Sequence, residues 1–197
     1  HKKDGKGILP ATYSNLSLPA QLQALSELEG SLDPLDFEET ITKDTLQSIY
    51  AIKSVQQTNG LPACHRYIIS NTQSALHVME LFALLRLCGW DQYLAHLDIV
   101  PLFETIEDLD NAEGIMKMLY ADPFYRIHLA HRQFKQTIML GFSDGTKDGG
   151  YLQANWSIYK AKERLTAISR ENQVEVLFFD GRGGPPSRGG GKTHQFY

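Results

Sequence analysis

Four short apolar runs, separated by segments with helical periodicity, constrain the fold of this chain more than any other sequence feature. They occupy residues 66–70, 97–103, 137–142 and 174–179. Their apolar residues are nearly continuous, as in strands of a parallel sheet that is covered on its faces. Helices are predicted around them at residues 75–87, 109–120, 123–136 and 148–170. Strands that alternate with helices at this spacing indicate βα units.

Two α/β architectures fit this pattern, a barrel of the TIM type and a doubly wound sheet. About four parallel strands with flanking helices would make half of an eight-stranded barrel. Residues 1–63 precede the strands and are predicted to be a helical segment, with helices near 16–28 and 40–57. Residues 64–197 are predicted to form the partial barrel, and both segments are expected to belong to one structural unit.

Charge and apolar content exclude several classes of partner. The net charge of −4 gives no reason to expect nucleic acid or an acidic membrane surface as a partner. No apolar run approaches the roughly 20 residues of a membrane helix, and the charged first residues lack the apolar stretch of a signal peptide. Cys64 and Cys88 lack the spacing of a disulfide framework or a zinc site. We therefore expect reduced thiols in a cytoplasmic protein.

Charged residues follow three of the four predicted strands. The strand ends comprise residues 70–72, 104–105, 143–145 and 180–182, and they include Glu104, Asp144 and Arg182. In parallel α/β folds, functional groups gather at the carboxyl ends of the strands. The coincidence of three charged strand ends predicts a site at this edge of the sheet.

Glu104 and Asp144 are candidate ligands for one hard cation, Mg²⁺ or Mn²⁺. Two carboxylates from adjacent strand ends would leave coordination positions for water and a phosphorylated substrate. Lys147 would add a positive charge for an anion. For the residues around Asp144 an alternative stays open, in which Thr146 or Asp148 caps the following helix and Lys147 is solvated.

Further acids follow Glu104, and their position at a predicted helix start has a simpler explanation. Negative side chains in the first turns complement the helix dipole. We expect this role for the remaining acids of the segment, Glu107, Asp108, Asp110 and Glu113.

A glycine-rich segment, residues 181–194, follows the fourth predicted strand. It has six glycines in its first eleven residues and carries Arg182, Arg188 and Lys192 without an acid. This composition predicts an anion-binding loop, since arginine suits bidentate contact with phosphate or carboxylate; a disordered tail is the alternative. The Gly-Lys-Thr at 191–193 is not a nucleotide-binding loop, because Pro186 stands where that motif needs glycine.

Taken in order and with their spacing, segments 100–109, 139–150 and 180–191 resemble the phosphoenolpyruvate carboxylase family. The strand-like run 67–70 and its following helix are also similar, so the resemblance covers about residues 64–197. It implies part of a TIM-like (β/α)8 barrel with many extra helices, in a polypeptide several times longer than this chain. The chain would then be a fragment that works with the remainder of the same polypeptide, in a family of homo-oligomers.

The resemblance also implies roles for individual residues. Glu104 and Asp144 would ligate Mg²⁺ or Mn²⁺. Arg182, with Gly183 and Gly184, would bind the phosphate of phosphoenolpyruvate. Lys147 and Arg188 would be catalytic on the side of bicarbonate or carboxyphosphate, and the glycine-rich segment would be a mobile catalytic loop. The implied reaction converts phosphoenolpyruvate and bicarbonate to oxaloacetate and phosphate.

The chain departs from the family pattern at several positions. Asp180 replaces a histidine, Phe142 a tyrosine and Gly145 a serine, while Pro185 and Pro186 stiffen the loop. The upstream motifs with a catalytic histidine (Thr-Ala-His-Pro) and an arginine (Asp-Ile-Arg-Gln) are absent. We therefore expect this chain to be inactive alone. The alternative function is a noncatalytic phosphate- and metal-binding or interaction domain derived from the same fold.

Overall fold

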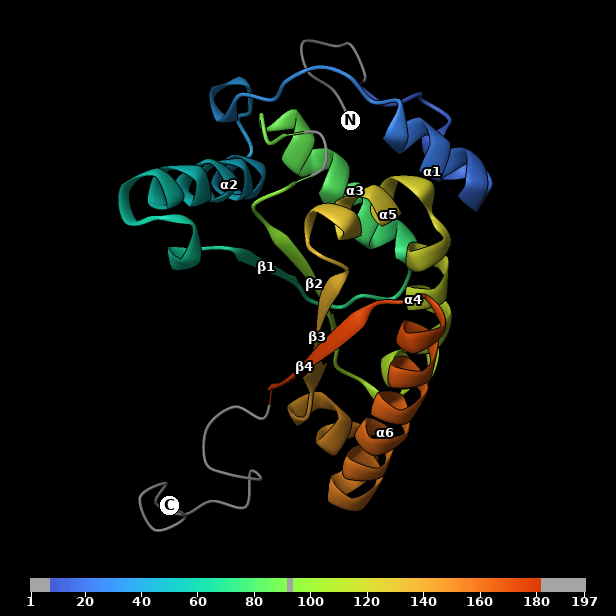
Figure 1. Cartoon of the computed structure of the whole chain (residues 1–197). Helices are drawn as coiled ribbons and strands as arrows, with labels where there is room; N and C mark the ends of the chain where they lie inside the picture. Colours follow the sequence, from blue (N-terminus) through green and yellow to red (C-terminus); the bar gives the residue numbers. More distant parts are fainter. Residues whose placement is uncertain (1–7, 92–93, 182–197) are drawn as a thin grey trace. The chain divides into compact units, whose positions relative to one another are not determined.

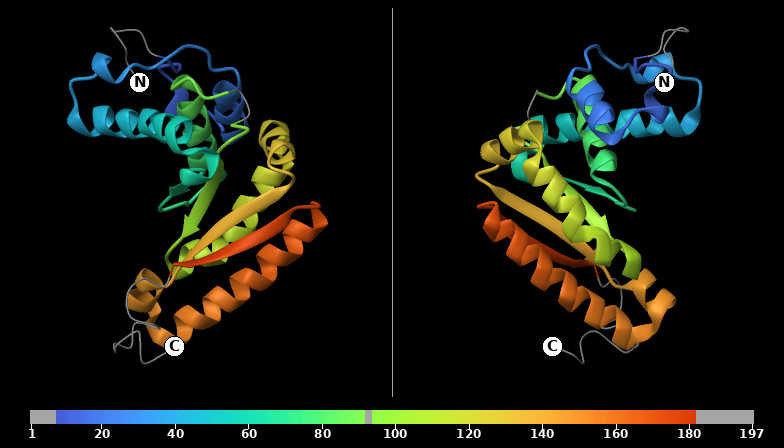
Figure 2. Two further views of the ribbon diagram at one scale, coloured as in Figure 1. Left: turned by 60° about the vertical axis from the view of Figure 1, so that its left-hand side comes forward. Right: turned by 90° about the vertical axis from the view of Figure 1, so that its right-hand side faces the viewer.

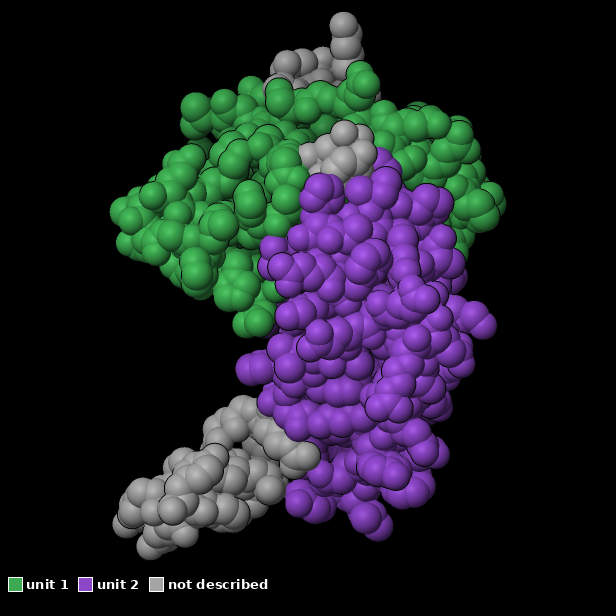
Figure 3. Space-filling view, in the orientation of Figure 1, with its two compact units in different colours: residues 1–66, 76–98 green, residues 67–75, 99–197 purple. Residues whose placement is uncertain are grey.

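A computed structural model describes residues 8–91 and 94–181 of the 197 residues. The chain divides into two compact units that are interleaved in sequence (Figure 3). The first comprises residues 1–66 and 76–98, and the second comprises residues 67–75 and 99–197. Each unit is described by itself below.

The first unit is helical. It contains α1 (Leu18–Ser26), α2 (Thr40–Asn59) and α3 (Ala75–Leu87), with single 3-10 turns at Tyr13–Asn15, Pro34–Asp36 and Leu61–Ala63 (Figure 1). The two predicted N-terminal helices are thus confirmed. Gly60 is the C-cap of α2, and its φ of 85° suits glycine. The core of this unit is aliphatic and aromatic, and includes the buried residues Leu25, Leu46, Ile49, Phe82 and Leu85.

The second unit contains a four-stranded parallel sheet. Its strands are β1 (Arg66–Ile69), β2 (Asp98–Phe103), β3 (Lys135–Gly141) and β4 (Glu175–Gly181), in the spatial order β1-β2-β3-β4. In the register, Phe103 lies opposite Leu140, and Gly141 lies opposite Gly181. A doubly wound sheet reverses its strand order, whereas a barrel keeps it sequential. The order therefore favours the barrel, and the predicted α/β class is confirmed.

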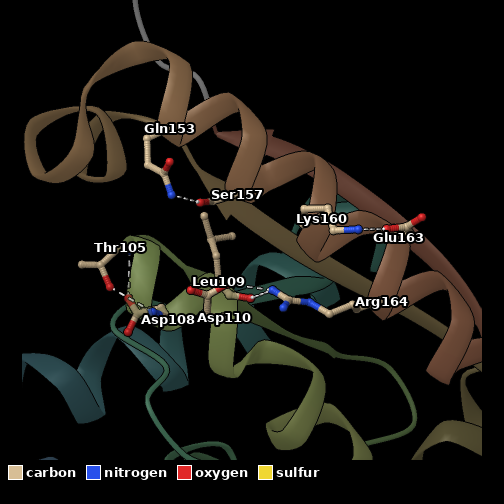
Figure 4. Close-up of polar contacts among 9 residues, drawn as sticks. All are labelled: Thr105, Asp108, Leu109, Asp110, Gln153, Ser157, Lys160, Glu163 and Arg164. Atoms are coloured by element: carbon tan, nitrogen blue, oxygen red, sulfur yellow. Dashed lines mark hydrogen bonds and ion pairs between the residues drawn. The ribbon is translucent and has the colours of Figure 1, made fainter.

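Helices α4 (Ile106–Ala121), α5 (Pro123–His131) and α6 (Ser143–Glu171) connect the last three strands. Because right-handed crossovers follow one direction along the sheet, α4 and α6 lie on the same face of it (Figure 2). Figure 4 shows Arg164 of α6 reaching to α4, where its Nη2 donates to the Leu109 carbonyl and to Asp110 Oδ1 at 3.3 and 2.9 Å. The two helices are therefore joined by a polar tie as well as by apolar packing.

Two predicted helix boundaries were wrong. The helix predicted for residues 123–136 ends at His131, and a turn with positive φ at Gln133 and Phe134 leads into β3. Gln136 is a buried strand residue whose side-chain amide donates to the carbonyls of Ile99 and Thr137. These contacts with β2 and within β3 decide the conformation of the segment.

The last helix begins at Ser143, five residues before the predicted start, and is kinked at Gly150. Gly150 has φ 80° and ψ 172°, which only glycine adopts readily. The early turn, residues 143–149, therefore forms a separate helical piece at the end of β3. Neither Thr146 nor Asp148 caps this helix, because both lie inside it.

Both cysteines carry free thiols, as predicted. Cys64 is partly exposed and Cys88 is buried, and burial raises the pKa of the Cys88 thiol to about 11. Within residues 8–91 and 94–181, no helix combines the length and the apolar composition that crossing a bilayer requires.

Candidate functional site

Strands β2 and β3 deliver Glu104 and Asp144 to the same edge of the sheet. Residues 99–103 of β2 are all buried, and Glu104 is the first residue beyond the strand. The parallel pairing of Phe103 with Leu140 places the end of β2 beside the end of β3. The two predicted strand-end acids are thus neighbours in space as well as equivalent in topology.

Glu104 is held through its backbone and its side chain. Its N–H donates to Asp108 Oδ2 at 3.3 Å, and its carbonyl accepts from the Gly145 N–H at 3.1 Å. Its carboxylate atom Oε2 accepts from the Asn71 N–H at 3.3 Å. These contacts come from α4, from α6 and from the segment after β1, so three parts of the second unit hold Glu104 in place.

Gly141 lies in close contact with Glu104. A Cβ atom built on Gly141 would lie 3.0 Å from Glu104 Cα and 3.3 Å from its Cγ. At Gly145 the same construction meets the Glu104 carbonyl oxygen at 3.5 Å, which is ordinary van der Waals contact. A side chain at position 141 would therefore require Glu104 to shift by a few tenths of an ångström, whereas one at position 145 would make ordinary contacts.

This difference gives a testable pair of variants. Gly141→Ala is expected to destabilise the chain by about 1–3 kcal/mol, because the added methyl overpacks against Glu104. Gly145→Ala is expected to be neutral or stabilising by up to about 1 kcal/mol, since alanine is the better helix residue. Guanidinium denaturation followed by circular dichroism measures both. Equal loss in the two variants would contradict the packing argument.

Asp144 begins α6 in an ion pair with Lys147. Lys147 Nζ lies 2.8 Å from Asp144 Oδ1, and the two side chains are 74% and 46% exposed. An exposed pair of this kind contributes less than about 1 kcal/mol, so a divalent cation can displace the lysine from the carboxylate. The structure thus joins two predicted site residues, with Lys147 as the counter-ion of Asp144.

The donor set at this edge fits a small hard cation. Mg²⁺ and Mn²⁺ sites commonly use one or two carboxylates and leave the other positions to water and substrate. Glu104 and Asp144 supply two partly exposed carboxylates from adjacent strand ends. Across residues 8–91 and 94–181 there is no group of three or more His, Cys, Asp or Glu placed to enclose a metal. A cation bound here would therefore leave most of its coordination positions to water and substrate.

Two of the acids of α4, Asp108 and Asp110, have structural partners. Asp108 and Thr105 form a capping box, in which the Asp108 carboxylate accepts from the Thr105 N–H and Thr105 Oγ1 accepts from the Asp108 N–H, both at 3.0 Å (Figure 4). Asp110 pairs with Arg164 at 2.9 Å. The capping role supports the interpretation of these acids as helix-start residues.

Asp180, where the resemblance implies a histidine, is also paired. Lys162 Nζ of α6 lies 2.7 Å from Asp180 Oδ1 and 2.9 Å from Oδ2. The substitution therefore puts an anion beside a lysine at the end of β4. The remaining predicted site residues, Arg182, Gly183, Gly184 and Arg188, lie outside the described residues.

Two positions at this edge were missed by sequence reasoning. Asn71 contacts the Glu104 carboxylate through its backbone, and its φ of 52° is one that asparagine tolerates better than most residues. The signal available in the sequence was an asparagine directly after a predicted strand. Gly141 was not singled out, because its neighbour Glu104 is far away in sequence.

Comparison with known proteins bears on the whole chain. The family profile described as phosphoenolpyruvate carboxylase matches residues 6–196. A phosphoenolpyruvate carboxylase of Gloeobacter violaceus is 36% identical over 190 residues, covering 93% of this chain and 20% of that protein. One from Corynebacterium diphtheriae is 40% identical over 164 residues, covering 81% of this chain and 18% of that protein.

The chain thus spans about a fifth of the length of the relatives it matches. A third relative, the phosphoenolpyruvate carboxylase of a Synechococcus strain, is 34% identical over 197 residues, covering 95% of this chain. The profile match extends over nearly every residue, including the helical segment before the strands. With the sequential parallel sheet and its acidic edge, these matches show that the chain belongs to the phosphoenolpyruvate carboxylase family.

Proposed function

We propose that this chain carries the cation-binding part of a phosphoenolpyruvate carboxylase active site. The complete enzyme converts phosphoenolpyruvate and bicarbonate to oxaloacetate and phosphate. The observation that supports this most is the placement of Glu104 and Asp144 at adjacent strand ends, tied by the hydrogen bond from Gly145 N–H to the Glu104 carbonyl. The family match supplies the reaction to which such a site belongs.

In this proposal Glu104 and Asp144 hold Mg²⁺ or Mn²⁺. When bound, the cation stabilises negative charge on the phosphoryl and enolate oxygens. With Asp144 held by the cation, Lys147 would lose its present partner, and its ammonium would serve the bicarbonate side of the site. In the structure Lys147 Nζ lies 2.8 Å from Asp144 Oδ1, so Asp144 is the partner that Lys147 would lose.

The glycine-rich loop supplies the remaining groups of this chain. Arg182, with the backbone of Gly183 and Gly184, binds the phosphate of phosphoenolpyruvate, and Arg188 serves bicarbonate and carboxyphosphate. A bicarbonate oxygen attacks phosphorus, and the bond from phosphorus to the enol oxygen breaks, which gives carboxyphosphate and the enolate of pyruvate. Carboxyphosphate yields CO₂ and phosphate, and the enolate carbon then forms a bond to CO₂. Exclusion of water from the site would protect the enolate from protonation.

The isolated chain is expected to be inactive although it retains the cation site. The catalytic histidine and arginine motifs of the family are absent from its sequence. A coupled assay that reduces oxaloacetate to malate should therefore detect no bicarbonate-dependent turnover by this chain, while Mn²⁺ titration followed by electron paramagnetic resonance detects binding. Metal- and bicarbonate-dependent oxaloacetate formation by the chain alone would contradict the expectation.

A chimera separates the enzyme from the alternative, a noncatalytic binding domain. The alternative would use the same groups of this chain, the two carboxylates and the loop arginines, to bind a cation and a phosphate without catalysis. In the chimera, residues 6–196 replace the matching segment of the Gloeobacter violaceus relative. We expect the chimera to form oxaloacetate and its Glu104→Gln form to lose this activity. A folded but inactive chimera would favour the noncatalytic domain.

A further inference from the structure

The segment between β1 and α3 is anchored to the neighbouring strand directly beside Glu104. Thr72 is fully buried, and its N–H donates to the Leu102 carbonyl of β2 at 3.3 Å. Its hydroxyl Oγ1 donates to the Ile69 carbonyl at 3.0 Å, which closes the turn after β1. The residue before it, Asn71, is therefore held at a defined distance from the end of β2.

Asn71 adopts a left-handed conformation at this point. Its φ is 52°, a value that most side chains avoid and that asparagine tolerates. Its side chain is exposed, and its backbone N–H donates to Glu104 Oε2 at 3.3 Å. The contact with the site is thus made by the backbone, and the side chain contributes through the conformation that it permits.

We propose that Asn71 is a positioning residue for Glu104, an inference that rests on the cation site proposed above. The Asn71 N–H fixes one carboxylate oxygen, Oε2, and so leaves Oε1 as the oxygen offered to a cation. With the Glu104 backbone already held by Asp108 and Gly145, this contact orients the side chain before the ligand arrives. A preoriented ligand binds more tightly because less freedom is lost on binding.

The proposal predicts that backbone conformation at position 71 matters and that the asparagine side chain does not. Asn71→Gly retains both the N–H and the left-handed conformation. Asn71→Val retains the N–H, but a β-branched residue strongly disfavours positive φ and moves the N–H away from Glu104. Both variants keep the backbone N–H at position 71, but only Asn71→Gly keeps it directed at the Glu104 carboxylate.

Mn²⁺ titration of the intact chain, followed by electron paramagnetic resonance, measures the effect. Asn71→Val is expected to raise the Kd for Mn²⁺ about fivefold, the equivalent of about 1 kcal/mol for one hydrogen bond. Asn71→Gly is expected to stay within about twofold of the unchanged chain. If Asn71→Val binds Mn²⁺ as tightly as the unchanged chain, the positioning role is overturned while the cation site stands.

Gln133→Val is the matched control for strain. Gln133 also has positive φ, 58°, and is exposed, but it lies in the turn between α5 and β3. We expect Gln133→Val to lower the melting temperature as Asn71→Val does and to leave the Kd for Mn²⁺ unchanged. An equal rise of Kd in both variants would assign the effect to general destabilisation and overturn the proposal.

A second measurement tests the contact without metal. In nuclear magnetic resonance spectra, Glu104→Gln is expected to move the Asn71 amide proton upfield, because a charge-assisted hydrogen bond becomes a neutral one. The Gln133 amide proton should not move. If the unchanged chain fails to bind Mn²⁺, the cation proposal fails, and this spectrum alone decides whether Asn71 orients Glu104. An unshifted Asn71 resonance overturns the inference in either case.

Discussion

Replacing Glu104 with glutamine is expected to weaken Mn²⁺ binding by the chain about 100-fold or more. Outer-shell partners of metal ligands already contribute 10- to 100-fold to affinity, and a direct carboxylate ligand belongs at or above the top of that range. Glutamine keeps the shape of the side chain and can still accept the Asn71 N–H, so the loss isolates the negative charge. Electron paramagnetic resonance titration with Mn²⁺ measures it, with circular dichroism as the check on folding.

Glu107→Gln is the control for this prediction. Glu107 undergoes the same chemical change, lies three residues further along the chain, and is exposed on the first turn of α4. We expect its effect on Mn²⁺ affinity to stay within about twofold, as for an exposed charge that is screened by water and salt. Similar losses in both variants would mean that Mn²⁺ is attracted by a diffuse acidic surface and has no defined ligand at Glu104.

Replacing Phe103 with alanine is expected to cost about 3–5 kcal/mol of unfolding free energy, the range for large-to-small changes in a packed core. Phe103 has no exposed surface and pairs with Leu140 of β3 in the parallel register. It is also the residue directly before Glu104. The loss is comparable to the whole stability of many domains, so the variant should unfold at much lower guanidinium concentration.

Phe179→Ala supplies the matched comparison. Phe179 lies in β4 and is 54% exposed, and its replacement by alanine removes the same phenyl ring. Its replacement is expected to change the unfolding free energy by less than about 1 kcal/mol, since much less apolar surface is buried there. Comparable midpoints for the two variants would contradict the burial that the structure assigns to β2.

Fold class and the acidic sheet edge were accessible from the sequence because both depend on local patterns. The nearly continuous apolar run at 97–103 became β2 (Asp98–Phe103), and the burial of residues 99–103 on both faces follows from the absence of polar residues among them. Glu104 and Asp144 were selected because polar residues after such strands lie at one edge of a parallel sheet. That topological rule needs no knowledge of distances.

Other features depended on partners that are remote in sequence. Gln136 was assigned to a helix by its neighbours but became a strand residue through its bonds to Ile99 and Thr137 and to the Tyr125 hydroxyl. Asp180 was seen as a departure from the family pattern, and only its ion pair with Lys162 supplied a structural partner. No local periodicity encodes either contact.

The chain's own sequence thus determined the four strands, most of the helices, the family and the two carboxylates worth testing. The tertiary structure decided the sequential strand order and the hydrogen bonds that hold Glu104. It also decided the close contact between Gly141 and Glu104 and the contact made by Asn71. The physical reason is the separation along the chain over which each kind of interaction acts. Apolar periodicity and turn chemistry act within a few residues, whereas strand register and hydrogen bonds across the sheet join residues that the chain places dozens of positions apart.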